Sequence, residues 1–552
     1  MMDAYRRNFI KLSAITAISL LMNGCGDGED CREEGTPPGV LTVTLYPEED
    51  MVEHTAKQIF LQFNKMITPL IFDGIILLDG KTELPIPGYT VAYDSGNPSG
   101  HRIAINLSDE FHLKESWKYT ILVTEKVRSV CGATLPEAVT LNVVTSSRDP
   151  FGAVESEESQ RSKIMIISDL HMNEQRACDE GYSLFTENGA LLVEFLEYVR
   201  NSKQIKELVI LGDLMDMWVV PMAYHTYHDG IGDTEAYFRA VAEADVNKEV
   251  IAKINQIANE GDIRFSYVPG NHDMLFTKEI FHTIFPNGHW QGGAPGTGVY
   301  SPETAVVCEH GHNYDLFNAP DSVTTSGSLL PPGYFITRIY ATGNLKSTEK
   351  LSIKPQSTEN KSAKLIYTTA WAAAVIAINI PNFDLTKPQI YTHVDGYTEQ
   401  YSSNSARDIY SQNIGENWQK RQKINGVRHP NPEIIGILNG TGKYFWFGTL
   451  EYSAAAQYFS PSGSDTNIVV FGHTHEAMLK KDSVTHNNIY ANSGTWIDSK
   501  YLNGDALTAT CIVLNTSASS GSDLDNATLY QAVNQGGKVV LKKIDEKVLD
   551  HS

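Results

Sequence analysis

The residues that could do chemistry are seven side chains of metal-binding type, each placed directly after a short apolar run. The five segments read, in chain order, KIMIISDLH, ELVILGDLMD, RFSYVPGNHD, TAVVCEHGH and NIVVFGHTH. The side chains are Asp169, His171, Asp213, Asn271, His310, His473 and His475. In a mostly parallel α/β sheet, functional groups gather beyond the carboxyl ends of the strands. The ordered set therefore predicts one shared metal site.

The types of these side chains indicate which metals they suit. Asp169 and His171 are two residues apart at a strand end, so both can point to the same side, and Asp213 has two oxygens that can bridge two cations. Imidazole and carboxylate ligands without cysteine favour Mn, Fe or Zn over Ca or a thiolate-bound metal. Seven ligands are too many for one tetrahedral ion, so we expect two divalent ions with open positions, about 3.5–4 Å apart as in phosphatases and nucleases.

The five segments resemble the signature of the calcineurin-like metallophosphoesterase family, which is D-x-H, G-D-x-x-D, G-N-H-[DE], H and G-H-x-H. In this chain the motifs stand at 169–171, 212–216, 270–273, 310 and 472–475. The resemblance covers roughly residues 160 to 515. It implies an α/β fold, a four-layer αββα sandwich with a dimetal site at one sheet edge.

The resemblance also implies a role for each motif residue. The first metal would be held by Asp169, His171, Asp213 and His475, and the second by Asp213, Asn271, His310 and His473. His272 would be the catalytic acid, paired with Asp216. In the fourth motif His312 competes with His310, and His310 is favoured because the family's ligand precedes the glycine.

These features predict a metal-dependent phosphoric ester hydrolase, either a phosphatase or a phosphodiesterase. A hydroxide that bridges the metals would attack phosphorus in line, and His272 would protonate the leaving oxygen. One alternative is a non-catalytic family member, which a lost ligand would mark, and none is lost. The other is a surface binding or adhesion protein that uses the N-terminal module, which an exposed aromatic platform in residues 38–147 would mark, where only Trp117 and a few Tyr are available.

A finer resemblance concerns the branch of the family that includes UDP-diacylglucosamine hydrolases. It rests on GDLMDMW at 212–218, on HGHNYD at 310–315 and on YANSGTWID at 490–498. Those lipid hydrolases carry Arg after the Asn, where this chain has His272. The substrate of that branch is therefore not carried over.

The N-terminus predicts export. Residues 1–24 combine the charged YRRNFIK with the short apolar LSAITAISLLMNG, as in a signal peptide, and the apolar part is too short to span a bilayer. The two arginines resemble a twin-arginine signal; an ordinary Sec signal is the alternative.

Gly24-Cys25 resembles the end of a lipobox, although Met22-Asn23 departs from the usual residues before the cysteine. The resemblance predicts a lipid on Cys25 and an extracytoplasmic lipoprotein, in the periplasm or at the cell surface. The alternative is a plain cleaved signal.

The remaining chain divides into segments of different composition. Residues 38–147 alternate apolar and polar residues between turn signals, which indicates a β-sandwich and resembles bacterial Ig-like domains. The predicted linkers are 25–37 and 148–162. The phosphoesterase domain is expected over 163–552, with a large cap insertion at about 320–462.

Two insertions are expected to shape the substrate pocket. The larger contains TTAWAAAVIAINI, which predicts a core or cap helix rather than a membrane span. The smaller, PMAYHTYHDGIGD, follows Asp216 and brings His225 and His228 as candidate substrate contacts; the alternative is that they are ordinary loop histidines. His312 and Asp273 are further candidates for substrate binding.

Cysteine content leaves the redox state open. The six cysteines are at 25, 31, 131, 178, 308 and 511. Cys308 and Cys511 lie in apolar runs and are expected to be buried thiols. Either Cys31 pairs with Cys131, as an oxidising compartment would allow, or all the cysteines are free.

The overall charge limits the class of partner. The chain has 66 acidic and 44 basic residues and a net charge of −22. Such a surface does not favour binding a polyanion by counterion release, so long nucleic acid is not the expected substrate. A small phosphate ester needs no basic patch because the two metals neutralise it. The membrane is expected to be contacted only through the lipid anchor, and the sequence does not indicate an oligomeric state.

Overall fold

In the computed structural model the chain forms two compact units, Met1–Glu155 and Ser156–Ser552. The structure describes residues 40–46, 51–52, 56–145 (except 81, 98, 109–110, 112 and 114–116), 161–346, 363–430 (except 381), 449–461, 464–481, 488–516 (except 503 and 505), 524–535 and 538–549. The predicted signal peptide, Cys25, the first linker and most of the second lie outside the described residues.

The first unit consists of strands in two four-stranded sheets. One sheet has the order β1-β3-β6-β5 and the other β2-β8-β7-β4. The strands are β1 (Val43–Tyr46), β2 (Met51–Val52), β3 (Gln58–Phe63), β4 (Ile75–Asp79), β5 (Tyr89–Tyr93), β6 (Arg102–Leu107), β7 (Lys118–Val123) and β8 (Val139–Thr145). All described pairings are antiparallel except β2 with β8, which is parallel.

One apolar core holds this unit together. Ile59, Leu61 and Phe63 alternate with more exposed residues along β3, so every second side chain points inward. They join Ile121 and Val123 of the other sheet in a single buried cluster. Cys131 is disulfide-bonded, so the alternative that all the cysteines are free does not describe this structure.

The second unit is built on two sheets. The seven-stranded sheet has the order β12-β11-β10-β9-β19-β20-β21 and the four-stranded sheet β13-β16-β18-β17. Their strands are β9 (Lys163–Ile167), β10 (Ile205–Leu211), β11 (Arg264–Val268), β12 (His289–Trp290), β13 (Val306–Cys308), β16 (Ile468–Phe471), β17 (Met478–Lys481), β18 (Ile489–Asn492), β19 (Thr510–Thr516), β20 (Leu524–Gln535) and β21 (Lys538–Val548). The pairings among β9 to β12 and among β13, β16 and β18 are parallel.

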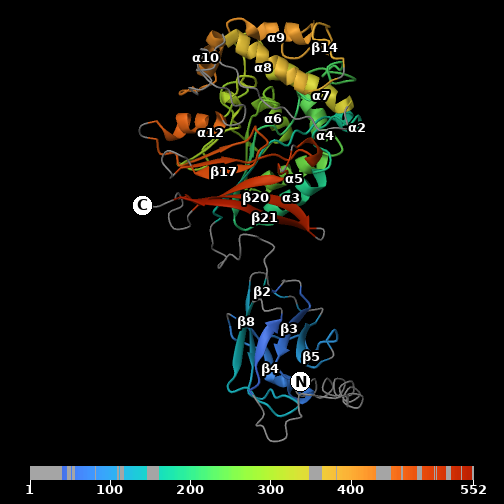
Figure 1. Cartoon of the computed structure of the whole chain (residues 1–552), viewed down its shortest axis with the longest axis vertical. Coiled ribbons are helices and arrows are strands. Elements are labelled where there is room, and N and C mark those ends of the chain that lie inside the picture. The colour runs from blue at the N-terminus through green and yellow to red at the C-terminus, as the bar shows by residue number, and fades with distance from the viewer. Residues whose placement is uncertain are drawn as a thin grey trace. The chain divides into compact units, whose positions relative to one another are not determined.

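The two sheets face each other across a shared core. Ile164 and Ile166 of β9 join Ile468 and Val470 of β16 in one buried cluster. Val469 and Phe471, the alternate residues of β16, pack instead with Leu450 of α12 (Thr449–Ala454). On the other side, α3 (Gly189–Asn201) and α5 (Lys248–Glu260) contact the seven-stranded sheet (Figure 1). Both sheets are therefore covered by helices on their outer faces.

All five predicted apolar runs are strands, and they are divided between the sheets. Strands β9, β10 and β11 belong to the seven-stranded sheet, and β13 and β16 are neighbours in the other. The runs are apolar throughout because these parallel strands are buried on both faces. The five motifs therefore follow strands of two facing sheets.

Residues 309–467, which we call the long connection, join β13 to β16. Its main elements are α7 (Pro332–Lys346), α8 (Ala363–Ala377), β14 (Ile390–Tyr391), β15 (Gln400–Tyr401), α9 (Ser403–Ser411) and α10 (Ile414–Ile424). Helices α7, α8 and α9 contact one another, and α10 contacts α8 (Figure 1). The predicted apolar helix is α8, with Tyr367 and Trp371 buried. Across the described part of the chain, no helix has the length and apolarity needed to cross a membrane.

Candidate metal centre

The motif residues lie in tight loops directly after their strands, and their backbone is unusual. Five of the seven candidate ligands have positive φ angles, a conformation that non-glycine residues rarely adopt. They are Asp169 (54°), His171 (53°), Asp213 (51°), His473 (72°) and His475 (59°). Such backbone conformations cluster at functional sites, where surrounding structure holds them in place.

Two motif glycines permit the close approach of these loops. A Cβ atom on Gly270 would lie 2.1 Å from Oδ1 of Asp213, and one on Gly472 would lie 2.6 Å from Oδ2 of Asp169. Both contacts are too short for any side chain. The glycines are therefore required for the carboxylates to reach their positions.

One group of facing ligand atoms is formed by Asp169, His171 and His475. Nε2 of His171 lies 2.9 Å from Nε2 of His475, and Oδ1 of Asp169 lies 3.3 Å from the latter nitrogen. Asp169 Oδ1 is buried and has no hydrogen-bond partner. Three ligand atoms thus converge on one point from two strand ends.

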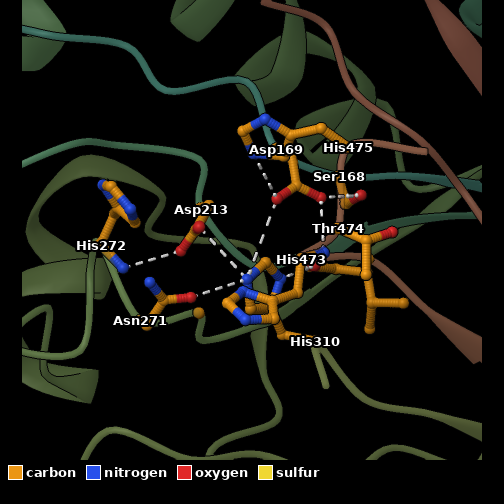
Figure 2. A network of polar contacts seen from close by, with 12 residues as sticks. Ser168, Asp169, Asp213, Asn271, His272, His310, His473, Thr474 and His475 are labelled. Atoms are coloured by element: carbon orange, nitrogen blue, oxygen red, sulfur yellow. Dashed lines mark hydrogen bonds and ion pairs between the residues drawn. The ribbon is translucent and has the colours of Figure 1, made fainter. Parts of the chain in front are cut away.

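A second group is formed by Asp213, His310 and His473. Nε2 of His310 lies 3.2 Å from Oδ2 of Asp213 and 3.1 Å from Oδ1 of Asn271 (Figure 2). The His473 ring lies 5.3 Å from the His310 ring, measured between centroids. The group itself comes from the second, fourth and fifth motifs, and Asn271 of the third motif contacts it through His310.

Asp213 lies between the two groups. Its Oδ2 is 3.2 Å from His310 Nε2 and 3.6 Å from His171 Nε2. A single carboxylate oxygen therefore faces one imidazole of each group. This is the position that a bridging ligand would need.

Hydrogen bonds behind the histidines fix which nitrogen faces the centre. Nδ1 of His171 donates to Oδ2 of Asp216 at 2.7 Å, and Nδ1 of His310 donates to the Leu211 carbonyl at 2.8 Å. In both rings Nε2 is then the nitrogen that faces the centre. Such outer hydrogen bonds orient histidine ligands and make them more basic.

The electrostatics of the centre favour positive charge. Burial disfavours the charged form of Asp169, but His310, His171 and His475 outweigh that effect and hold the pKa of this carboxyl below its usual range. Burial likewise opposes a charged His310, yet Asp213 and Asp169 raise the pKa of His310 to about 9. Among the described residues, no Lys or Arg pairs with these carboxylates.

These observations test whether the residues fit metal ions. Asp169 has an unpartnered buried oxygen, and the buried carboxylates have histidines but no Lys or Arg as partners in the described chain. Each feature is costly without a cation and is satisfied by one. The mixed imidazole, carboxylate and amide oxygen donors suit Mn, Fe or Zn. The site therefore fits divalent metals.

His272 and Asp216 lie beside the first group. Nδ1 of His272 donates to Oδ2 of Asp216 at 2.8 Å, the same oxygen that accepts from His171. The other Asp216 oxygen accepts the backbone N–H groups of Trp218 and Val219 at 2.7 and 2.8 Å. The His272 side chain is 14% exposed, whereas Asp216 is fully buried. Nδ1 of His272 is thus engaged, and no described residue is hydrogen-bonded to its Nε2.

The four candidate substrate contacts occupy different environments. Asp273 is fully buried and accepts backbone N–H groups of Gly270, Leu214 and Met215. His312 is also buried, and its Nε2 donates to the Gly296 carbonyl at 2.8 Å. These positions do not fit a direct substrate contact, because both side chains are enclosed by protein. Asp273 instead ties the second and third motif loops together.

His225 and His228 lie nearer the surface. The His225 ring is exposed and lies 5.3 Å from the His393 ring and 5.0 Å from the Tyr391 ring, between centroids. His228 lies with Nε2 3.4 Å from Oε1 of Glu174. Neither histidine belongs to the groups of facing metal-ligand atoms.

Some residues of the site were missed by sequence reasoning. Oδ2 of Asp315 lies 3.2 Å from Nε2 of His473, and Nδ2 of Asn318 lies 3.5 Å from the same nitrogen. Asp315 ends the HGHNYD segment, so a signal for it was present. Ser168, whose hydroxyl donates to Asp169, and Trp218, whose ring packs on His272, also lie in quoted segments, KIMIISDLH and GDLMDMW, but sequence reasoning gave them no role.

Comparison with known proteins gives one family match. Residues 162–340 match the family model of the calcineurin-like phosphoesterases. The resemblance expected from the motifs is thereby confirmed over this range, which is shorter than the predicted 160–515. No curated protein sequence matches the chain.

Similarity to solved structures is weak. The N-terminal part of the bacterial S-layer protein SbsC has 15% identity and a TM-score of 0.16, over 19% of this chain and 24% of that one. CopC from Methylosinus trichosporium OB3b has 16% identity and a TM-score of 0.15, over 20% of this chain and 97% of that one. A predicted phosphoesterase from Streptococcus pneumoniae TIGR4 has 10% identity and a TM-score of 0.22, over 69% of this chain and 98% of that one. Scores this low support no conclusion about function.

The family match and the convergence of His and Asp side chains lead to the same chemistry. The matched range contains the first four motifs and ends within α7, and the fifth motif meets them in space. Members of this family bind divalent metals. Residues 162–340 thus carry a calcineurin-like phosphoesterase domain, which indicates a metal-dependent phosphoester hydrolase.

Proposed function

We propose that the protein is an exported phosphoesterase that uses two divalent metals to hydrolyse a small phosphomonoester or phosphodiester. The observation that carries this proposal is the position of Asp213, whose Oδ2 faces His171 at 3.6 Å and His310 at 3.2 Å. One carboxylate between two groups of ligand atoms is the arrangement that two neighbouring cations need.

The proposed ligand sets follow the two groups. Asp169, His171, Asp213 and His475 would hold one ion, and Asp213, Asn271, His310 and His473 the other. When bound, such cations supply Lewis-acid stabilisation of phosphoryl oxygens and lower the pKa of water. The net charge of −22 favours a small substrate over a polyanion.

His272 is the proposed general acid. Its Nδ1 is engaged by Asp216, so the Nε2–H is the group available to protonate the leaving oxygen. Burial disfavours the charged Asp216 carboxyl, but His272 and His171 outweigh this and hold its pKa below the usual range. An ionised Asp216 keeps the His272 tautomer and orientation fixed, as a carboxylate does for a catalytic histidine.

The N-terminal unit is proposed to be a bacterial Ig-like domain that acts as a spacer. Two four-stranded sheets around one apolar core support this proposal. Trp117, one of the few aromatic residues available for an exposed platform, packs against that core and donates its Nε1–H to Asp79 at 3.1 Å. This placement gives no support to the alternative of an adhesion protein.

The long connection is proposed to act as a cap over the site, because its helix α7 contacts the loop that follows Asp216 through Arg338.

Export and lipid attachment at Cys25 are proposed from residues 1–25 alone. Fractionation of wild type and Cys25→Ala tests the anchor: Cys25→Ala should leave the membrane fraction, and its retention there would contradict lipid attachment. An Arg6→Lys/Arg7→Lys variant separates the routes, since undiminished export would indicate Sec.

The decisive experiment is a panel of phosphate esters on protein reconstituted with Mn, Fe or Zn, with elemental analysis of the same samples. We expect about two metals per chain and hydrolysis of monoesters or diesters. A metal content reproducibly well below one per chain after loading would contradict the two-metal proposal. Full loading with no turnover of any ester would contradict the hydrolase.

A further inference from the structure

The His272 ring is held on two sides besides its hydrogen bond to Asp216. The Trp218 ring packs on it at 4.7 Å between centroids with an interplanar angle of 31°, and the His171 ring meets it edge-on at 4.5 Å. The hydrogen bond alone leaves the ring free to rotate about the Nδ1–Asp216 direction. Trp218 removes much of this freedom because it covers one face of the ring.

Trp218 is itself positioned by the long connection. It is buried, and its indole meets the Tyr334 ring of α7 at 6.1 Å with an interplanar angle of 82°. Its backbone N–H donates to Asp216 at 2.7 Å. The residue that covers the proposed acid is therefore fixed from one side by the motif loop and from the other by α7.

Arg338, one turn further along α7, ties the same loop to the helix. It is fully buried, and its Nε and Nη2 donate to the carbonyls of Val220 at 2.6 Å and Pro221 at 3.1 Å. Nη2 also donates to the Tyr224 carbonyl, and Nη1 to the Tyr334 hydroxyl at 2.7 Å. Among the described residues no carboxylate pairs with it. Burying a cation with only neutral oxygens as partners is costly. The planar guanidinium, whose N–H donors point in fixed directions, lets one side chain reach all four acceptor oxygens.

We propose that Arg338 is a positioning residue for the proposed acid: it fixes residues 218–224 against α7, and through Trp218 it holds the His272 ring in the orientation that protonates the leaving oxygen. This inference rests on the proposed function. It makes helix α7 of the long connection part of the catalytic apparatus rather than only a cover over the substrate.

The chain contains a matched control. Arg421 of α10 is also fully buried, and its guanidinium donates to three carbonyls, those of Leu316, Ala319 and Pro320. Those carbonyls follow Asp315, which contacts His473 at the second group rather than His272. The two arginines are alike in burial and in their bonds to backbone carbonyls, but Arg421 also has Oδ2 of Asp321 3.6 Å from its Nε, and they serve opposite sides of the centre.

The test compares Arg338→Lys with Arg421→Lys on phosphate esters of one type whose leaving groups range from nitrophenol to a simple alcohol. Lysine keeps the positive charge but lacks the planar guanidinium that donates to several oxygens at once. Arg338→Lys should lower turnover of the alkyl ester by about 10- to 100-fold, within the range of a misplaced acid, and of the nitrophenyl ester by less than about 3-fold. Metal content should not change. Arg421→Lys should leave the leaving-group dependence of wild type.

A second pair of variants keeps the proposal testable where Arg338→Lys folds poorly. Trp218→Phe shrinks the ring that covers His272, and Tyr334→Phe removes only the hydroxyl that accepts from Arg338. Both variants should lose turnover selectively on alkyl esters. The loss should be smaller for Tyr334→Phe than for Trp218→Phe. In a His272→Gln background, Arg338→Lys should add almost nothing, since the two act on one step.

Two results would overturn the inference: an equal loss on both esters with metals retained, or the same selective loss in Arg421→Lys. Failure of the proposed function would look different, because wild type itself would then hydrolyse no ester. Failure of the acid role alone would show as a His272→Gln variant with unchanged leaving-group dependence.

Discussion

The two units of this protein bury different kinds of side chain. Within the described residues, the N-terminal unit buries only two polar side chains, Ser129 and Thr145, and no acidic, basic or histidine side chain. The second unit buries Asp169, Asp213, Asp216, His171 and His310 at the ends of its strands. The first unit thus has an ordinary apolar core.

This difference indicates where the chemistry lies. Burying a charge without compensation is unfavourable, and the described residues of the N-terminal unit bury none. The second unit accepts buried carboxylates and positive φ angles because they preform a cation site. Perturbations of the two units should therefore have separable effects.

Removal of the metals should have the largest effect. Dialysis against a chelator should reduce hydrolysis to background and lower the thermal stability of the second unit, because ligand binding stabilises only the folded state that binds it. Hydrogen exchange in β3 and β7 should not change. Faster exchange in those strands after chelation would show that the units are coupled.

Asp213→Asn should cause the next largest loss. We expect turnover to fall by about 10⁴-fold, the scale for removing a central member of a catalytic set, and more than for His475→Ala, since Asp213 faces both groups. Initial rates and metal content measure this. Near-wild-type turnover of Asp213→Asn would remove the bridging assignment.

His272→Gln should reduce turnover by about 10²–10³-fold on alkyl esters, within the range of general acid catalysis, while metal content stays constant. Nitrophenyl esters should lose less because they need less protonation. The readout is the slope of log kcat against the pKa of the leaving group. An unchanged slope would assign His272 to some other role.

Leu61→Ala in the N-terminal unit should leave activity unchanged. It removes a fully buried side chain of β3 and should destabilise that unit by about 2–5 kcal/mol. The comparison variant is Leu211→Ala in β10, whose carbonyl accepts from His310, and which should reduce both stability and activity. Denaturant unfolding followed by an activity assay separates the two outcomes.

Much of the fold could be predicted from local pattern. The apolar runs that became β9, β10, β11, β13 and β16 were recognisable because strands buried on both faces are continuously apolar. The alternation in β3 was equally clear. Their division between two facing sheets came only through family resemblance, since pairing partners are far apart in sequence and are not encoded in local periodicity.

The site was predictable in its residue types but not in its supports. The spacing of D-x-H and G-H-x-H placed the ligand-type residues at the loop ends. It could not show that Asp273 and His312 turn inward to backbone groups. Nor could it show that Arg338 reaches back to the loop after Asp216, because hydrogen bonds from a side chain to distant carbonyls leave no pattern in the sequence.

The pairing of β9 with β19 has a consequence for synthesis of the chain. Lys163 at the start of β9 contacts Asn515 in β19, a separation of 352 residues. While the ribosome makes the intervening chain, β9 has one open, strongly apolar edge, and such edges promote aggregation. The N-terminal unit can fold early, whereas the catalytic unit depends on its last strands. A nascent chain that stalls before residue 510 should therefore depend on chaperones that cover exposed strands.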